Sequence, residues 1–217
     1  MPLEYEYGFY NFDKKLVIKN IKKLGAKKKG IFIFKVMVFE HPLNIDNSYI
    51  RIRDEGFRTT LTYKMKDPKS NFDNEDEVVI DNFETGMKIL FNLGCKKKYY
   101  YEKIREIWIL KNSEIIFDTN PGEPDRMEIE SQTKKELDNL IKELDIVHLI
   151  TKNDYDPLID LFNLVIPKNI DINFKTVKKD LGSLVKKNKS MFNKLCDNQL
   201  VIYNKIFAKN LKNNINN

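Results

Sequence analysis

The feature that most constrains the fold is an internal repeat that starts from a Glu-x-Glu motif. Glu4-x-Glu6 is followed by the triplet NFD, a helix-like stretch and the run LGAKKK. Glu75-x-Glu77 is followed at the same spacing by NFE, a second helix-like stretch and LGCKKK. A looser third repeat begins at Glu128-x-Glu130 and leads into the capping-box pattern TKKE and an amphipathic helix. We therefore expect three acidic strands, each followed by a helix.

Further strand-like stretches lie between the repeats. They are rich in β-branched and aromatic residues and are bounded by loops rich in Asn, Asp and Pro. They cover residues 31–39, 49–53, 59–66, 99–110 and 114–118. Together with the Glu-x-Glu strands they make about eight strands, which is enough to close a barrel. The sequence thus predicts an α+β fold with a closed or nearly closed β-barrel and flanking helices.

The pattern becomes helical from about residue 154 to the Asn-rich end of the chain. We therefore expect a barrel domain over residues 1–150 and a helical C-terminal extension over residues 151–217 that packs on it. The extension is a candidate to brace the barrel, to cover one of its ends or to form a homodimer contact.

Charged side chains follow the two-residue period of the strands, so residues two apart share a strand face. The acidic pairs are Glu4 with Glu6, Glu75 with Glu77, and Glu128 with Glu130. The basic pairs are Arg51 with Arg53, Lys64 with Lys66, and Lys103 with Arg105. Burying so many unpaired charges inside a barrel would cost several kcal/mol each. The interior is therefore expected to be hydrated and ion-paired, or to hold a charged ligand.

A metal-bound polyphosphate fits such an interior. Arg and Lys bind phosphate oxygens, and a hard divalent cation such as Mg or Mn takes oxygens from carboxylates and phosphates together. A single Glu-x-Glu is more often a solvated strand face with cross-strand ion pairs. Three Glu-x-Glu motifs in register with a repeat, combined with three basic pairs, favour the ligand-binding interpretation.

The order of these motifs resembles the CYTH superfamily, the triphosphate tunnel metalloenzymes that include class IV adenylyl cyclases and thiamine triphosphatases. The matching segments are, in order, residues 4–6 (EYE), 49–53 (YIRIR), 61–64 (LTYK), 75–77 (EDE), 103–105 (KIR), Asp118 and 127–130 (MEIE). The resemblance covers about residues 2–146. It implies an antiparallel eight-stranded tunnel that grips a triphosphate and one or two Mg or Mn ions.

The resemblance and the charge pattern together predict which residues form the site. Those expected to be catalytic are Glu4, Glu6 and Lys64. Those expected to bind the triphosphate are Arg51, Arg53, Lys64, Lys66, Lys103 and Arg105. Those expected on the metal side are Glu4, Glu6, Glu75, Glu77, Asp118, Glu128 and Glu130. Asp118 is equally compatible with capping the turn that precedes Pro121.

One position departs from the family pattern. The N-terminal signature of the family is Glu-x-Glu-x-Lys, and its last position is Gly8 in this chain. Strand alternation puts position 8 on the face of Glu4 and Glu6, so one phosphate contact or catalytic charge is missing there. Lys35, in the next strand-like stretch, is a candidate substitute.

The predicted function is metal-dependent hydrolysis of a triphosphate, which could be inorganic triphosphate, a nucleoside triphosphate or an RNA 5′ end. The first alternative is a class IV-type adenylyl cyclase, which would use the same grip on ATP to make cyclic AMP. The second is a non-catalytic protein that binds a triphosphate or nucleotide, because Gly8 stands where the lysine is expected. The sequence does not separate these three.

Composition and charge indicate which partners and which cellular compartment to expect. The formal net charge of +6 favours anionic partners, although 38 basic residues are mixed with 32 acidic ones. No apolar run approaches the roughly 18 residues of a membrane span, and the N-terminus lacks the zones of a secretory signal. We therefore expect a cytoplasmic protein. Cys95 and Cys196 fit neither a disulfide framework nor a zinc motif.

Overall fold

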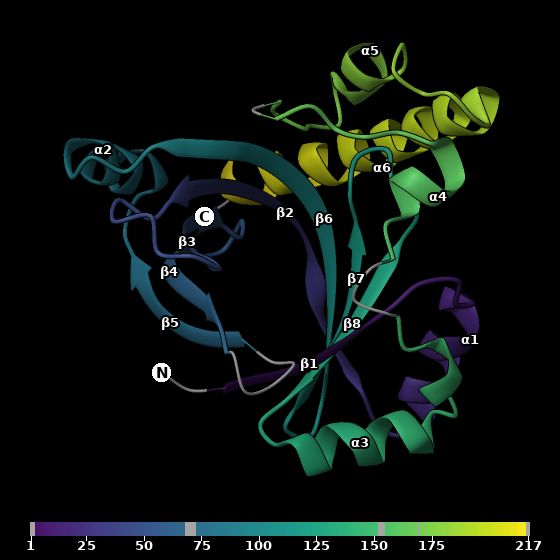
Figure 1. Cartoon of the computed structure of the whole chain (residues 1–217). Coiled ribbons are helices and arrows are strands. Elements are labelled where there is room, and N and C mark those ends of the chain that lie inside the picture. Colours follow the sequence, from purple (N-terminus) through teal and green to yellow (C-terminus); the bar gives the residue numbers. More distant parts are fainter. Residues whose placement is uncertain (1–2, 68–72, 152–154, 169, 216–217) are drawn as a thin grey trace.

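Eight antiparallel strands close into a barrel in the computed structural model, which describes residues 3–67, 73–151, 155–168 and 170–215 (Figure 1). The strands are β1 (Leu3–Phe9), β2 (Lys27–Glu40), β3 (Ser48–Asp54), β4 (Thr59–Lys66), β5 (Asp73–Ile80), β6 (Lys97–Leu110), β7 (Ser113–Thr119) and β8 (Arg126–Ser131). Their order around the barrel is β1-β5-β4-β3-β2-β6-β7-β8. The predicted antiparallel barrel is confirmed.

Each Glu-x-Glu strand leads into a helix, as the repeat predicts. The helices are α1 (Lys14–Lys23), α2 (Phe83–Asn92) and α3 (Lys134–Glu143). The side chains of Asp13, Asn82 and Thr133 cap them by accepting hydrogen bonds from backbone N–H groups of the first turn. Gly25 and Gly94 follow α1 and α2 with φ of 92° and 85°, a left-handed conformation that ends a helix.

Strands β2 and β6 start earlier than the sequence predicts. The lysine-rich segments after α1 and α2 enter these strands, which begin at Lys27 and Lys97. The two strands pair with each other along almost their whole length, from Lys27 opposite Ile109 to Phe39 opposite Lys97. This long pairing extends the strand conformation through residues whose own propensity for it is low.

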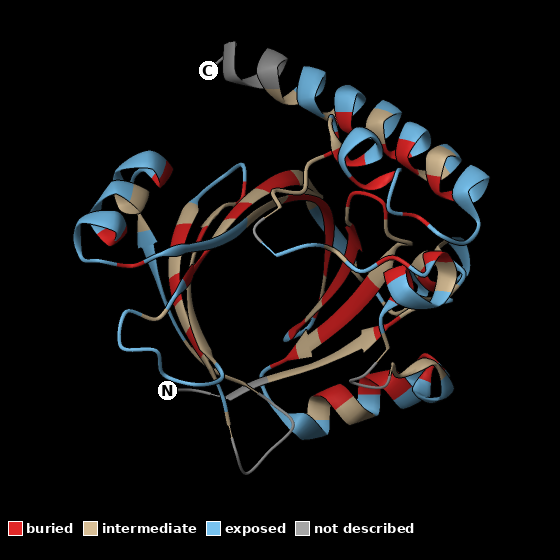
Figure 2. Ribbon diagram, turned by 45° about the horizontal axis from the view of Figure 1, so that its top comes forward, coloured by how far each residue is buried: buried red, intermediate tan, exposed pale blue. Residues whose placement is uncertain are grey.

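Most of the apolar core lies outside the barrel, between the strands and the helices, and a smaller cluster that includes Phe34, Val36 and Ile107 lies on the inner side of β2 and β6. One cluster joins β1, β7 and β8 to α1 and α3, and it includes Phe9, Ile115, Ile129 and Leu137. A second cluster packs α2 against the outer face of β2, β3 and β4. Figure 2 shows the buried residues along the strands and on the helix faces turned toward them. Because side chains alternate, an apolar outer face leaves most of the charged strand residues for the interior.

The C-terminal extension contains α4 (Pro157–Phe162), α5 (Val177–Leu181) and α6 (Lys189–Ile215), and a short 3₁₀ helix, η1 (Val147–Leu149), precedes it. The extension has its own apolar cluster, which includes Leu158, Phe162, Leu181 and Phe192. A further cluster of Ile33, Ile104, Phe174 and Tyr203 joins it to β2 and β6. Hence the extension packs on the outer face of the barrel, as Figure 1 shows for α6.

Backbone and side-chain hydrogen bonds also attach the extension to the barrel. The N–H of Ile172 donates to the carbonyl of Tyr100, and the N–H of Glu102 donates to the carbonyl of Ile172, both at 2.9 Å. The buried side chain of Gln199 on α6 accepts from the N–H of Gly122 and donates to the Asn120 and Glu123 carbonyls. The extension is therefore held at β6 and at the loop between β7 and β8. Within the described residues, no helix combines the length and apolarity needed to span a membrane.

Candidate functional site

The inner faces of all eight strands enclose a cavity of about 410 Å³, the barrel cavity. Its acidic lining residues are Glu6, Glu55, Asp73, Glu75, Glu77, Glu114, Glu128 and Glu130. Its basic lining residues are Lys29, Arg51, Arg53, Arg58, Lys64, Lys103, Arg105 and Arg126. The barrel thus brings most of the charged residues nominated from the sequence into one space, because the two-residue period of each strand turns them to the same side.

One half of the lining is an ion-pair network across β3, β4 and β5. Nη2 of Arg51 lies 3.3 Å from a Glu75 carboxylate oxygen, and Nη2 of Arg53 lies 3.1 Å from Glu77. Nζ of Lys64 lies 3.4 Å from Glu75, the residue opposite it in the β4–β5 register. The register of neighbouring strands therefore sets which acid meets which base.

The other half joins β6, β7 and β8 around buried Asp118. Its carboxylate accepts hydrogen bonds from Nζ of Lys103 at 2.8 Å and from Nε of Arg105 at 2.7 Å. Nη2 of Arg105 also donates to Glu128 at 2.7 Å. Burial alone would raise the pKa of Asp118, but the charges of Arg105 and Lys103 outweigh it and hold that pKa well below its usual range.

These contacts decide between the two roles that the sequence left open for Asp118. The side chain is directed to the inner face and is 3% exposed, so it does not cap the following turn. In that turn the N–H of Glu123 donates to the carbonyl of Asn120 at 3.1 Å, and across the loop the hydroxyl of Thr119 donates to Asp125 at 2.6 Å.

Arg126 is a lining residue that the sequence reasoning missed. It lies at the start of β8, two residues before Glu128, and its Nη1 is 3.0 Å from a Glu128 carboxylate oxygen. Gly8 is directly opposite Glu128 in the β1–β8 register. A Cβ atom added to Gly8 would lie 2.8 Å from Nη2 of Arg126. The signal was present in the sequence, because Arg126 continues the two-residue period of Glu128 and Glu130.

Two nominated basic residues do not line the barrel cavity. Lys35 lies between Phe34 and Val36, which belong to the cluster on the inner side of β2, so alternation turns it outward. Its Nζ is 3.9 Å from a carboxylate oxygen of Asp54. Lys35 therefore does not replace the lysine missing at Gly8, contrary to the sequence-based expectation. Lys66, at the end of β4, is exposed and also absent from the lining.

Glu4 is placed only by its backbone. It belongs to β1 and pairs with Asp73 of β5, which puts it two residues from Glu6 on the same strand. Its side chain lies outside what the structure describes.

Several donors in the cavity wall lack a partner. Among the described lining residues, Nε of Arg51 and Nε of Arg53 are buried without a hydrogen bond. Burial and the neighbouring positive charge of Arg51 lower the pKa of Arg53. A bound anion would accept hydrogen bonds from these unpaired donors and offset the repulsion between the neighbouring cations.

The carboxylates supply the oxygen donors that a hard divalent cation prefers. Glu6 and Glu130 are direct neighbours across β1 and β8, with Glu128 next along the same strand. Nowhere in the described ranges do three or more acidic, His or Cys side chains form a ready metal cluster. This donor set fits a cation such as Mg, which typically binds one or two carboxylates and completes its shell with phosphate oxygens and water.

The closed antiparallel barrel and its charged interior define a tunnel protein with an α+β fold. The chain belongs to the CYTH domain family, whose model matches residues 3–154.

Solved structures share this fold. PH1012 from Pyrococcus horikoshii is 24% identical, with a TM-score of 0.58 over 71% of this chain and 94% of that one. A conserved hypothetical protein from Pyrococcus furiosus is 20% identical, with a TM-score of 0.57 over 71% and 95%. A proposed adenylate cyclase from Vibrio parahaemolyticus is 14% identical, with a TM-score of 0.62 over 71% and 95%. No curated protein is significantly similar in sequence.

The C-terminal extension lies beyond this shared part. The family match ends at residue 154. Because 94–95% of each of these three neighbours is already matched, they have little chain left to correspond to the rest of this one.

Proposed function

We propose that this protein is a metal-dependent triphosphatase that binds its substrate in the barrel cavity. The observation that carries the proposal is the convergence of basic side chains from β3, β4, β6 and β8 on one enclosed space, with buried donors left unpaired on Arg51 and Arg53. A triphosphate is a compact polyanion that can satisfy several of these donors at once.

The ion pairs in the cavity suggest how the substrate is accommodated. Arg51, Arg53, Lys64, Lys103 and Arg105 are the proposed phosphate ligands. Each now contacts a carboxylate, and phosphate oxygens offer the same acceptor chemistry with more charge. When phosphate takes these donors, carboxylates such as Glu75 and Glu128 are released. The released carboxylates can then hold a divalent cation beside the phosphate.

The proposed metal side consists of Glu4, Glu6, Glu75, Glu77, Asp118, Glu128 and Glu130. A bound Mg or Mn ion would supply charge neutralisation and a water of lowered pKa. The basic side chains would stabilise the negative charge of the transferred phosphoryl group in a cavity that excludes bulk water, where electrostatic interactions are stronger.

We further propose that Arg126 provides the positive charge for which the family signature uses lysine at position 8. Its guanidinium lies over Gly8 and beside Glu128. This favours a working enzyme over a non-catalytic binding protein, because the missing charge is present on a different strand. An adenylyl cyclase remains the second candidate, since the Vibrio parahaemolyticus neighbour carries that description.

The test is a substrate panel with Mg or Mn that contains inorganic triphosphate, ATP and a 5′-triphosphorylated RNA. Phosphate, pyrophosphate and cyclic AMP are measured from the same incubations. We expect phosphate release, with kcat/KM reduced about 100-fold or more by Arg53→Ala and Glu128→Gln. Lys35→Ala, on the outer face, is the matched control and should retain activity. Cyclic AMP with pyrophosphate would indicate the cyclase, and tight binding without turnover would indicate a binding protein.

A further inference from the structure

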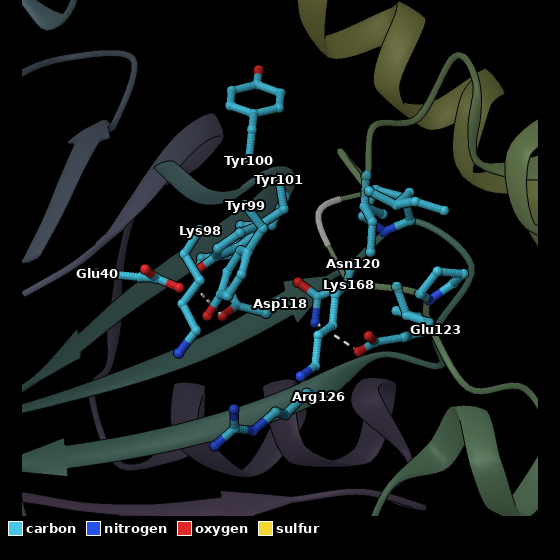
Figure 3. A pocket seen from close by; sticks show the side chains of 16 residues that line it. Glu40, Lys98, Tyr99, Tyr100, Tyr101, Asp118, Asn120, Glu123, Arg126 and Lys168 are labelled. Atoms are coloured by element: carbon cyan, nitrogen blue, oxygen red, sulfur yellow. Dashed lines mark hydrogen bonds and ion pairs between the residues drawn. The ribbon is translucent and has the colours of Figure 1, made fainter. Parts of the chain in front are cut away.

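The loop between β7 and β8 connects Asp118 to Arg126, two residues of the candidate site. They are the last opposed pair of the β7–β8 ladder, and residues 120–125 join the strands beyond them. The loop borders a second cavity of about 600 Å³, which we call the outer cavity (Figure 3). Its lining includes Asp118, Asn120, Glu123 and Arg126, and Arg126 lines the barrel cavity as well. The conformation of the loop therefore affects how the two strand ends enter the site.

The loop turns tightly at Pro121 and Gly122. The hydrogen bond from the N–H of Glu123 to the carbonyl of Asn120 closes a four-residue turn. Gly122 has φ of 81°, in the left-handed region that favours glycine at the third position of such a turn. Nδ2 of Asn120 also donates to a Glu123 carboxylate oxygen at 2.9 Å. The N–H of Gly122 and the carbonyl of Glu123 form hydrogen bonds to a residue outside the loop.

That residue is Gln199 of α6, whose side chain is buried. Its Oε1 accepts from the N–H of Gly122 at 2.8 Å. Its Nε2 donates to the carbonyl of Glu123 at 2.7 Å and to that of Asn120 at 3.0 Å. A primary amide has two N–H donors and one carbonyl, so these three bonds use all of its polar groups. Ionised glutamate has the same length but no donor, so the loop specifically requires the amide.

Apolar packing holds the loop against the same part of the molecule. A Cβ atom added to Gly122 would lie 3.0 Å from the ring of Phe192 on α6 and 3.2 Å from Val177 on α5. Both residues belong to the apolar cluster of the C-terminal extension. The extension therefore fixes the loop by polar and apolar contacts together. These contacts come from beyond residue 154, where the family match ends.

Of the two strand ends, the one that carries Arg126 depends more on the loop. Asp118 is held from the barrel side by hydrogen bonds from Lys103 and Arg105. Arg126 is the first residue of β8, directly after the loop, and its side chain is 36% exposed. Burial raises the pKa of Glu123 in the loop, and the positive charge of Arg126 opposes that shift, so the two side chains interact. A displaced loop would therefore move Arg126 more readily than Asp118.

We propose that Gln199 is a positioning residue for the barrel cavity, which keeps the Arg126 guanidinium beside Glu128 by holding the loop between β7 and β8. This inference rests on the proposed function and adds a residue of the extension to it. Gln199 is outside the lining of both cavities, so it acts through the loop. A misplacement of about 1 Å at a reacting centre can cost about 100-fold in rate, so support from outside the cavity affects catalysis.

The test is a double-mutant cycle on the full-length protein, measured as phosphate release from inorganic triphosphate with Mg. Gln199→Met keeps the length of the side chain and removes all three hydrogen bonds. Alone, it should lower kcat/KM about tenfold, mainly through kcat. Combined with Arg126→Ala, it should cause a further loss of less than about twofold, because the group that it positions is absent. Combined with Lys64→Ala, it should cause the full loss of about tenfold, since β4 neighbours neither β7 nor β8.

Two further measurements support the cycle. Asn198→Ala is the control and should retain activity, because Asn198 is the exposed neighbour of Gln199 on α6. Hydrogen exchange reports on the loop without any substrate. The N–H of Gly122 should exchange at least about fivefold faster in Gln199→Met, as expected for the loss of one hydrogen bond.

The outcomes separate this inference from the proposed function. An equal loss from Gln199→Met with and without Arg126→Ala would overturn the inference and leave the triphosphatase standing. Unchanged exchange at Gly122 would do the same. A wild-type protein without turnover of any triphosphate would overturn both. If thermal unfolding shows that Gln199→Met does not fold, Gln199→Asn replaces it in the same cycle with the same expectation, because its amide is one methylene too short to reach the loop.

Discussion

Arg126 occupies the space that Gly8 leaves open on the inner face of the barrel. A Cβ atom at position 8 would lie 2.8 Å from Nη2 of Arg126 and 3.1 Å from its Nε. The two positions lie on neighbouring strands, and Glu128 links them, since it pairs with Gly8 and contacts Arg126. Glycine at position 8 and arginine at position 126 are therefore coupled: a side chain at position 8 would require the end of the Arg126 side chain to shift from this place.

This coupling predicts a rescue. Arg126→Ala should lower kcat/KM for the triphosphate substrate about 100-fold, the usual effect of removing one group that stabilises developing charge. Gly8→Lys alone should also lower it, because the new side chain would displace the Arg126 guanidinium from its place beside Glu128. The double variant Gly8→Lys/Arg126→Ala should recover much of the activity, as measured by phosphate release. A double variant no more active than Arg126→Ala would contradict the coupling.

Substitution of Lys64 should affect substrate binding much more than substitution of Lys66, although both residues belong to β4. Lys64 lines the barrel cavity, whereas Lys66 is exposed at the strand end. We expect Lys64→Ala to raise KM for triphosphate at least tenfold, because it removes a phosphate donor in an enclosed space. Lys66→Ala should change KM less than about threefold, as is usual for a charge at a solvated rim. Equal losses in steady-state assays would show that the rim takes part in binding.

Asp118 should be important for stability as well as for the site. Asp118→Asn removes the charge that pairs with Lys103 and Arg105, and breaking a buried pair typically costs about 3–5 kcal/mol. Urea unfolding measures the loss of free energy. Asp197→Asn is a matched control, because its ion pair with Lys178 is exposed and such pairs contribute less than about 1 kcal/mol. A loss for Asp118→Asn no larger than for the control would refute this account of the network.

Stability should fall in acid. The pKa values of Asp118 and Glu128 are lowered in the folded protein, where burial is outweighed by the charge of Arg105. A lowered folded pKa stabilises the protein above the unfolded pKa, and that contribution is lost as the pH falls through the folded value. We expect this contribution to be complete above about pH 5 and to decrease steadily below about pH 4. Midpoints of urea unfolding against pH test this, and Asp118→Asn should flatten the curve.

Metal removal should abolish activity without unfolding the protein. Ion pairs between basic and acidic side chains already compensate the inner-face charges in the described part of the chain. With EDTA and no triphosphate, we expect the melting temperature to change by less than about 2 °C, because a ligand that is not bound in the absence of substrate adds no folding energy. A large drop in melting temperature would instead indicate a structural metal.

Local patterns in the sequence were sufficient to predict the barrel and much of its lining. The repeat predicted that acidic strands lead into capped helices, and Asp13, Asn82 and Gly25 have the expected roles. The two-residue period correctly grouped Arg51 with Arg53 and Lys103 with Arg105 on the inner face. These features depend on the alternation of side chains along one strand, which neighbouring residues in the sequence already specify.

Other features required the tertiary structure, because they depend on which strands become neighbours and in what register. Lys35 faces outward because β2 places Phe34 and Val36 inside, a choice of strand face that the sequence of β2 alone left open. The contact of Arg126 with Gly8 arises only when β8 pairs with β1.

The outer cavity is the clearest case. It joins Tyr99 and Tyr101 of β6 to Ile166 and Ile170, residues from a segment far away in the sequence. The sequence by itself therefore determined the charged strands and their inner faces, since these follow from periodicity. Only the tertiary structure decided which charges meet and what closes the end of the barrel, since both depend on packing between distant segments.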